Sequence, residues 1–344
     1  MDPNADPEYD VERWNETRFF GYWSPSANAG LFVHAGRLRR DLDLWWSHLG
    51  VFLPDGAVAV DRQWCRNTEP RGLVNHNLRW VSQESFRSFE CSFDGVCEVT
   101  STEALAAGVR GAGSPSLPIS WNFTARAHSP VWEVFKQKEG DKSWAGNSHT
   151  QQTFETTGEI TIGGETLDFS GFAYNDHSVG VRDFRHFGGD DFLVAALPEG
   201  AAHWVLVKAN HDPSITRFNG HYFSGRDDTG TELTGGSIPP QRDLVMADRN
   251  LDLAVTGADG TETTLKLEVL GVLPITINDA NDNLNGLDWD GVSDAVFFAE
   301  TAVRVTAPDG RVGYGHLERS VRRHLADRTS FAVTQPQTAQ PETV

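Results

Sequence analysis

Apolar and polar residues alternate along most of this chain, in short segments that end at turn residues. Residues 263–277 (TTLKLEVLGVLPITI) and 294–307 (DAVFFAETAVRVTA) show the two-residue period of strands with one buried face. Glycine-containing pairs, which tolerate the positive φ of tight hairpin turns, separate such segments. They predict hairpins at Asp55-Gly56, Asp94-Gly95, Gly163-Gly164, Asp259-Gly260 and Asp309-Gly310, and Pro198-Glu199-Gly200 predicts another. Helical patterns are limited to residues 101–111 and 318–327, so we expect an all-β protein.

The length of 344 residues suits two hydrophobic cores of roughly 150 residues each. All-β chains protect their sheet edges by forming closed barrels or sandwiches. We therefore predict one β domain over residues 1–155 and a second over 156–325. The polar segment 136–152 (KQKEGDKSWAGNSHTQQ) would connect them, and the Pro-rich residues 326–344 would form a disordered tail.

The charge of the chain excludes several partners. The 48 acidic residues outnumber the 29 basic ones, for a formal net charge of −19. Nucleic acids and anionic membranes are therefore not expected partners, because phosphate binding needs clustered Lys and Arg. No apolar run approaches the roughly 18 residues of a membrane helix, so we expect no integral membrane segment. The N-terminus MDPNADPEYDVERW lacks the basic and apolar regions of a secretion signal, which favours a cytoplasmic protein. The oligomeric state is not indicated.

The chain has three cysteines, Cys65, Cys91 and Cys97. An odd and low count does not indicate a disulfide framework. Cys91 and Cys97 flank the segment SFDGV, so a bridge across the hairpin predicted there is the one alternative.

One stretch, residues 171–184 (GFAYNDHSVGVRDF), concentrates reactive side chains next to an apolar strand-like segment. On a strand, positions i and i+2 share a face, so Phe172, Tyr174, Asp176 and Ser178 would point the same way, about 7 Å apart in succession. A carboxyl group held against aromatic rings loses hydration and can act as a general acid near neutral pH. A tyrosine beside it can donate a hydrogen bond or face a developing cation.

A purely structural role of the same residues is the alternative. Asp, Asn and Ser commonly satisfy backbone groups at the ends of strands, and Arg182 could pair with Asp183. The spacing by itself does not decide between a reactive site and a scaffold.

The stretch resembles the signature G-x-Y-x-D-H-S-W-G-x-R-D-W of the superfamily of carotenoid 1,2-hydratase (hydroxyneurosporene synthase), kievitone hydratase and the lipocalin-like Diels–Alderases. The N-terminal WNETRFFGYWSP and the C-terminal DGRVGYGHLE fit the superfamily less specifically. The resemblance implies two lipocalin-like (calycin-type) β-barrel or sandwich domains packed together. The ligand cavity would lie at or near their junction.

The resemblance also implies roles for residues of this chain. Asp176 would protonate an alkene, Tyr174 would help to hold the resulting carbocation, and His177 would orient the groups. The upstream His-x-Trp of the hydratases corresponds to His149-Thr150-Gln151, where Gln151 replaces the aromatic residue, and His149 would act as a catalytic residue that reaches in from the other domain. Ser178, Gly180, Arg182 and Asp183 complete the motif as structural residues, whereas Val179 and Phe184 depart from its tryptophans. The candidate substrate-contacting residues are Phe172, Gln151, Trp144 and Trp204.

We expect neither a metal nor another cofactor. Residues 278–291 (NDANDNLNGLDWDG) have partial EF-hand spacing, but Val292 stands where the bidentate Glu belongs, and no helices flank the segment. The histidines do not show metal-ligand spacing. Neither a G-x-S-x-G motif nor a Gly-rich phosphate loop occurs.

These features favour a cofactor-independent hydratase or cyclase acting on a lipophilic, unsaturated terpenoid- or polyketide-like small molecule. Two alternatives remain. One is an isomerase or pericyclase that shapes its substrate without adding water. The other is a lipocalin-like carrier, for which a buried carboxyl group would be an unneeded cost in stability.

Overall fold

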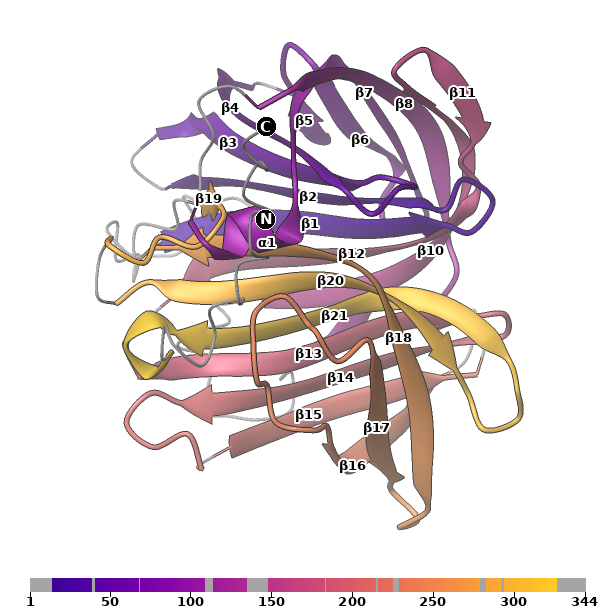
Figure 1. Ribbon diagram of the computed structural model, residues 1–344. Coiled ribbons are helices and arrows are strands. Elements are labelled where there is room, and N and C mark those ends of the chain that lie inside the picture. The colour runs from indigo at the N-terminus through magenta and orange to yellow at the C-terminus, as the bar shows by residue number, and fades with distance from the viewer. Residues whose placement is uncertain are drawn as a thin grey trace, which may run out of the picture.

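The protein consists almost entirely of antiparallel strands, arranged in two sheets that lie one above the other (Figure 1). The computed structural model describes residues 14–38, 41–67, 69–108, 114–134, 148–182, 184–214, 216–224, 229–278, 283–291 and 294–326. Within these residues, no helix combines the length and the apolar character that a membrane crossing needs.

Among the described residues, the first sheet has twelve strands. They are β1 (Trp14–Ser24), β2 (Ala29–Leu38), β3 (Asp41–Phe52), β4 (Val58–Arg66), β5 (Gly72–Val74), β6 (Leu78–Glu84), β7 (Ser88–Thr100), β8 (Ser116–Ala127), β9 (Trp132–Glu133), β10 (Ser148–Ile162), β11 (Glu165–Asp168) and β12 (Gly171–Val181). Pairing runs through β10, β12, β1, β2, β3, β4 and β7, and β8 pairs with both β7 and β10. Hydrogen-bonded neighbours therefore continue all the way round the first sheet. A short helix, α1 (Thr102–Ala106), follows β7.

The second sheet has nine strands in the part of the chain that the structure describes. They are β13 (Phe187–Leu197), β14 (Gly200–Ala209), β15 (Thr216–Phe223), β16 (Thr231–Ser237), β17 (Asn250–Gly257), β18 (Glu262–Ile277), β19 (Asn283–Asn285), β20 (Val296–Thr306) and β21 (Val312–Arg322). The pairing of β17 with β18 closes eight of these strands into a barrel. Two 3-10 turns, η1 (Phe184–His186) and η2 (Arg323–Leu325), lie just before β13 and just after β21.

The all-β class expected from the alternating pattern is confirmed, and of the two forms left open, barrel or sandwich, the sheets adopt the barrel. The predicted change of domain at residues 155 and 156 falls inside β10, and the chain passes from the first sheet to the second between Val181 and Phe187. Whether each barrel folds on its own stays a prediction. Of the predicted tail, only Ala326 is among the described residues.

The hairpin predicted at Asp94-Gly95 is wrong. β7 continues through both residues, and its register with β8 pairs Asp94 with Ser120 without interruption. Gly95 serves packing instead, because a Cβ there would lie 2.6 Å from the ring of Phe93. As β7 is one continuous strand, Cys91 and Cys97 do not face each other across a turn, and all three cysteines are free thiols.

The described side chains form three apolar clusters. One lies inside the first barrel and includes Phe20 and Trp121, and another lies inside the second barrel and includes Leu193 and Val303. The third contains Phe32 of β2 together with Phe192 of β13, so it lies where the two sheets face each other. Strands β1 and β12 contact β21 across this junction. The candidate site lies in the same layer.

Candidate active site between the two barrels

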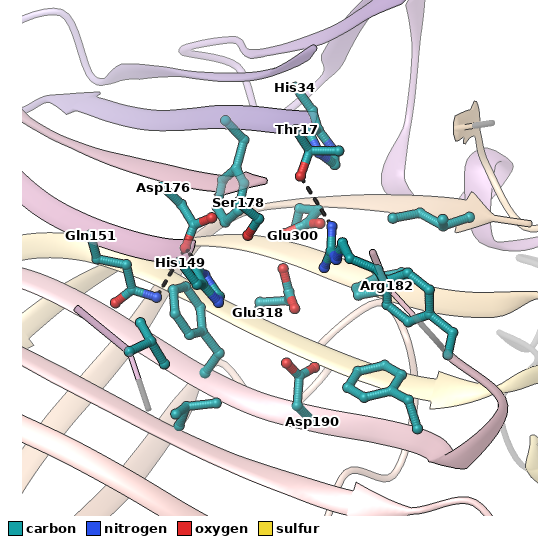
Figure 2. A pocket seen from close by; sticks show the side chains of 18 residues that line it. Thr17, His34, His149, Gln151, Asp176, Ser178, Arg182, Asp190, Glu300 and Glu318 are labelled. Atoms are coloured by element: carbon teal, nitrogen blue, oxygen red, sulfur yellow. Dashed lines mark hydrogen bonds and ion pairs between the residues drawn. The ribbon is translucent and has the colours of Figure 1, made fainter. Parts of the chain in front are cut away.

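A small cavity of about 60 Å³ lies between the two sheets (Figure 2). Its described lining mixes polar and apolar groups. The polar side chains are Thr17, His34, His149, Gln151, Asp176, Ser178, Arg182, Asp190, Glu300 and Glu318. The apolar ones are Phe19, Val134, Phe184, Phe187, Phe192, Val205, Ile277 and Phe298. Titratable groups therefore face a space that is otherwise walled by aromatic rings.

Strand alternation in β12 places Asp176 in this cavity. Tyr174 belongs to the apolar cluster between the sheets, whereas its neighbour Ala173 belongs to the core of the first barrel. Asp176 and Ser178 lie on the side of Tyr174, and both line the cavity. The two-residue period expected for the motif is therefore correct. The Asp176 side chain is almost completely buried, with 1% exposure.

The Asp176 carboxyl group is held by two residues of β10. His149 Nε2 lies 2.6 Å from Asp176 Oδ2, and Gln151 Nε2 donates to the same oxygen at 3.0 Å. The register of β10 and β12 places Gln151 directly opposite Asp176. No described residue donates to the second oxygen, Oδ1. One carboxyl oxygen is thus fixed in position, and the other remains available to a molecule in the cavity.

Gln151 also connects the site to the second barrel. Its Oε1 lies 3.1 Å from Nδ1 of His203, a fully buried residue of β14. Burial lowers the pKa of His203 to about 3, so the ring is neutral and its Nδ1–H donates to the amide oxygen. This bond orients the amide, because it leaves the Gln151 nitrogen directed at Asp176. The position of the acid therefore depends on both barrels.

Arg182 brings a cation to the opposite end of the cavity. Its guanidinium donates to Thr17 Oγ1 at 3.1 Å and lies 4.7 Å from the centre of the Phe184 ring. Burial lowers the pKa of Arg182 to about 10, which still leaves the group charged at neutral pH. The predicted partner Asp183 lies outside the described residues.

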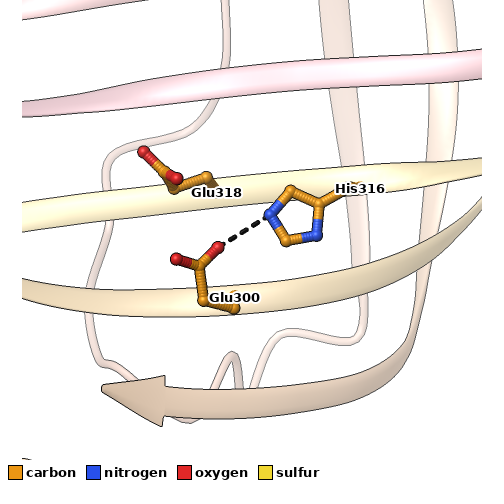
Figure 3. Close-up of side chains that lie close together, drawn as sticks. All are labelled: Glu300, His316 and Glu318. Carbon is orange, nitrogen blue, oxygen red and sulfur yellow. Dashed lines mark hydrogen bonds and ion pairs between the residues drawn. The ribbon is translucent and has the colours of Figure 1, made fainter. Parts of the chain in front are cut away.

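The second barrel contributes acidic groups to the facing wall. Glu300 of β20 and Glu318 of β21 are direct cross-strand partners, and His316 lies beside them (Figure 3). His316 Nε2 lies 2.7 Å from Glu300 Oε2. Burial raises the pKa of Glu300 well above its ordinary value and lowers that of His316 to about 3. The two form a neutral pair, in which the carboxyl O–H of Glu300 donates to the imidazole nitrogen.

The same three residues are the group that could hold a metal ion within the described chain, since their ligand atoms lie within 4.8 Å of one another. The neutral pair satisfies Glu300 and His316 without an ion, so the geometry does not require one. The absence of a metal or cofactor requirement stays a prediction. Asp190, on the same wall, accepts a hydrogen bond from the hydroxyl group of Ser320. Burial raises the pKa of Asp190 to about 6.

The structure does not bring every predicted site residue to the cavity. Tyr174 lies just beside it, with its ring 4.9 Å from the ring of His316 and 5.6 Å from that of Phe19. Phe172 contacts His128, at a ring distance of 5.4 Å, and does not line the cavity.

Two further candidates face other parts of the fold, and one is not described. His177 points to the opposite face of β12, where its Nε2 lies 2.9 Å from Glu16 Oε1. Trp204 is fully buried within the core of the second barrel. Trp144 lies outside the described residues.

The acidic wall was not found from the sequence. Glu300 stands inside the apolar segment AVFFAETAVRV, and Asp190 in GGDDFLVAAL. A charged residue in the middle of an apolar strand segment is the signal that points to such a site. Asp176 and Glu300 are far apart in the chain, so no local pattern shows that they share a cavity.

Comparison with known proteins identifies the family. The sequence matches the family described as "Domain of unknown function (DUF7064)" over residues 2–323. The chain belongs to this family. The family description assigns no activity.

Two solved structures share the fold of this DUF7064 member across nearly its whole length. An AttH-like protein from Nitrosomonas europaea superposes with a TM-score of 0.57 at 15% identity, covering 94% of this chain and 97% of that one. CghA, solved with Sch210972, gives 0.52 at 10% identity, covering 90% and 89%. These likenesses confirm the fold that the sequence motif implied. Kievitone hydratase from Nectria haematococca matches with a TM-score of 0.49 at 12% identity, covering 93% and 94%.

A relative is also found by sequence. The chain is 25% identical over 260 residues to the iodate reductase subunit IdrA of Denitromonas iodatirespirans. The match covers 74% of this chain but 24% of that subunit, so the chain spans about a quarter of the subunit's length. The likeness concerns one part of a larger protein.

Proposed function

We propose that this protein is a cofactor-independent enzyme that protonates a lipophilic unsaturated small molecule, with Asp176 as the acid. The arrangement of the Asp176 carboxyl group carries the proposal. Oδ2 is held by His149 and Gln151, Oδ1 has no donor among the described residues, and the cavity in front of it is lined by five phenylalanine rings. A positioned general acid next to apolar surface suits proton transfer to carbon.

The proton would pass from Oδ1 of the protonated Asp176 to one carbon of a substrate alkene. A C–H bond forms from the alkene π electrons, the O–H bond breaks, and a carbocation remains on the other carbon. Phenylalanine ring faces such as those of Phe19 and Phe298 would stabilise that charge. Attack by water followed by loss of a proton completes a hydration. Attack by a second alkene forms a ring and a new cation, whose loss of a proton completes a cyclisation, and direct loss of a proton from the first cation completes an isomerisation.

His149 would assist the acid through the other carboxyl oxygen. As Oδ1 gives its proton to the substrate, Oδ2 takes a proton from Nε2 of protonated His149, and when the product-forming step returns a proton to Oδ1, Oδ2 gives its own back to His149. Its Nε2 is 2.6 Å from Asp176 Oδ2, which is within direct proton-transfer distance. Gln151 keeps the carboxyl group from rotating while the proton is exchanged, because its amide is itself fixed by His203. In this account His149 and Gln151 are positioning and relay residues, and Asp176 is the group that meets the substrate.

The volume of the cavity limits what can enter it. About 60 Å³ has room for roughly four or five water molecules, well below the 300 Å³ or more of a typical pocket for a drug-sized ligand. We therefore propose that only the reacting end of the substrate, such as a branched alkene terminus, occupies the space beside Asp176. The remainder of a longer substrate would require lining side chains to move.

The fold comparison supports a small-molecule role. CghA, which has the same fold, was solved with the organic molecule Sch210972. A structure of this type can therefore accommodate an organic ligand of that kind.

Isotope labelling tests the proposal. The protein is incubated with linear isoprenoid alkenes in water enriched in heavy oxygen, alongside Asp176→Asn. Incorporation of the heavy oxygen indicates hydration, and a rearranged product without the label indicates an isomerase or cyclase. Both outcomes support acid catalysis if Asp176→Asn abolishes them. Binding without any chemical change, by the wild type and the variant alike, would identify a carrier and contradict the proposal.

A further inference from the structure

A second and larger cavity lies on the other face of the same strands. Its volume is about 370 Å³, and it adjoins the turn between β6 and β7 of the first barrel. Arg18, Gln152 and His177 line it, and each directly follows a residue that lines the Asp176 cavity: Thr17, Gln151 and Asp176 respectively. Strand alternation thus separates the two cavities by a single sheet, and they share no lining residue.

The charge of this second cavity is opposite to that of the chain as a whole. Its described lining contains the cationic Arg18, Arg71 and Arg87 but no Asp or Glu. The chain overall carries 48 acidic residues against 29 basic ones. Such a lining focuses a positive potential into the cavity and attracts anions there.

A buried carboxylate next to the cavity, that of Glu16, does not neutralise this positive charge. Glu16 is 4% exposed and forms ion pairs at 2.8 Å with Arg18 and with Arg37, while His177 contacts the same carboxylate at 2.9 Å. One carboxylate therefore faces two permanently charged guanidinium groups, and an excess positive charge remains. Burial lowers the pKa of His177, so its contact with Glu16 is a hydrogen bond from a neutral ring.

The two other arginines are weakly engaged. Arg71 Nε lies 3.3 Å from Glu69, and Arg87 Nε lies 3.1 Å from Glu84, with both arginine side chains more than half exposed. Exposed ion pairs of this kind contribute little to stability. Both guanidinium groups are therefore free to turn towards a ligand at small cost.

Phe86 gives the cavity an exposed aromatic edge. It occupies the turn between β6 and β7 with a φ of 58°, a left-handed conformation that is costly for a bulky residue. Burial does not compensate for this, because 57% of the side chain is exposed. Gln152 Nε2 donates to the Phe86 carbonyl oxygen at 3.0 Å and helps to hold the turn. A strained and exposed aromatic residue at the edge of a cavity is a common feature of ligand contacts.

We propose that this cavity binds a small organic anion in which a flat apolar body carries a carboxylate. The carboxylate would be held by Arg18 and Arg71, since guanidinium groups match carboxylate geometry. The apolar body would lie between the Phe86 ring and the Trp80 side of the cavity. The volume of about 370 Å³ is in the range of natural small-molecule sites.

Calorimetric titration with two ligands of similar shape tests the charge requirement. 2-Naphthoate is compared with the neutral 2-naphthylmethanol. We expect naphthoate to bind at least about tenfold more tightly, because it gains charge-assisted hydrogen bonds. Equal affinities of the two ligands, or no saturable binding of naphthoate, would contradict the proposal.

Arginine variants locate the binding site. Arg18→Gln and Arg71→Gln should each weaken naphthoate binding about tenfold and leave naphthylmethanol binding unchanged. Arg79→Gln is the matched control. Arg79 is exposed on the outer face of β6, and its substitution removes the same charge from the protein. An equal loss of affinity in Arg79→Gln would show that only the overall charge matters and would overturn the assignment.

A glycine variant separates the roles of the Phe86 backbone and ring. Phe86→Gly relieves the left-handed strain and removes the ring, so the melting temperature should stay the same or rise while the affinity for naphthoate falls several-fold. This combination of opposite effects is specific to a ligand contact. A Phe86→Gly protein that binds naphthoate as tightly as the wild type would exclude Phe86 from the site.

Discussion

His149 Nε2 and Asp176 Oδ2 lie 2.6 Å apart, on two neighbouring strands of the first barrel. The pair is buried, and Asp176 presents its second oxygen to a cavity that the second barrel completes. The acid is thus oriented by one barrel and enclosed by the other. This arrangement gives distinct expectations for the relay, for the acidic wall and for the bridging amide.

The relay predicts the effect of His149→Gln. Glutamine can still donate a hydrogen bond to Asp176, but it cannot pick up and return a proton. Turnover should fall by about 10², with little change in substrate affinity, because binding rests on apolar contacts. Steady-state kinetics across pH checks this, with the exposed His76→Gln as the control for loss of a histidine. Wild-type turnover in His149→Gln would remove the relay from the mechanism.

The buried pair of Glu300 and His316 predicts how stability depends on pH. Burial raises the pKa of Glu300 in the folded protein, so the folded state retains a proton that the unfolded chain releases above about its ordinary pKa of 4.5. Through Glu300 alone, the wild type therefore loses stability as the pH rises above that value, by up to about 1.4 kcal/mol for each pH unit, and the neutral buried His316 offsets this loss below its ordinary pKa of 6.5.

Glu300→Gln removes the contribution of Glu300 and keeps that of His316. The amide N–H₂ still donates to His316 Nε2, but no proton is exchanged. The variant should gain in melting temperature over the wild type as the pH rises from 5 to 8, and the two should converge near pH 4. Melting curves at several pH values measure the difference. A difference that shrinks as the pH rises would show that Glu300 is ionised and stabilising.

The bridging amide predicts a loss of stability in Gln151→Leu. The substitution leaves His203 Nδ1–H without its acceptor and removes one donor from Asp176, and both groups are buried. Unfolding should become easier by about 1–3 kcal/mol, the usual effect of leaving a buried polar group unpaired. Urea unfolding measures this against Gln83→Leu, which alters an exposed glutamine of β6. Equal midpoints for the two variants would show that the bridge adds no stability.

The fold was largely predictable because alternation and turn residues are local signals. Gly56, Gly260 and Gly310 adopt the positive φ that their turns need, as expected. Gly95 has the same sequence context but sits inside β7, because the bulky Phe93 ring requires a residue without a side chain there. A dipeptide alone does not distinguish a turn glycine from a packing glycine.

The candidate site was predictable in part. Asp176 lines the cavity, as the strand period of the motif indicated, but His149 and Gln151 reach it from the neighbouring strand of the same barrel and not from the other domain. Glu300 and His203 come from the other barrel, and their approach to Asp176 depends on how two sheets pack, which no local pattern encodes.

His177 shows that a place in the sequence motif does not by itself put a residue in the site. It follows Asp176 directly in the motif, yet strand alternation turns it to the opposite face and into a different cavity.

The central claim is that Asp176 donates a proton, and Asp176→Asn tests it most directly. Asparagine keeps an oxygen to accept from His149 and Gln151 but cannot act as an acid. Asp191→Asn is the comparison, because Asp191 is equally buried but pairs with Arg319 and Lys208 away from the cavity. Its substitution should lower the melting temperature without changing turnover per folded molecule.

The measurement is turnover per folded molecule for both variants, taken with their melting temperatures. We predict a fall of about 10² to 10⁴ for Asp176→Asn at a nearly unchanged melting temperature. Wild-type turnover per folded molecule in Asp176→Asn, together with early melting, would show that the motif is a scaffold and contradict the proposed function.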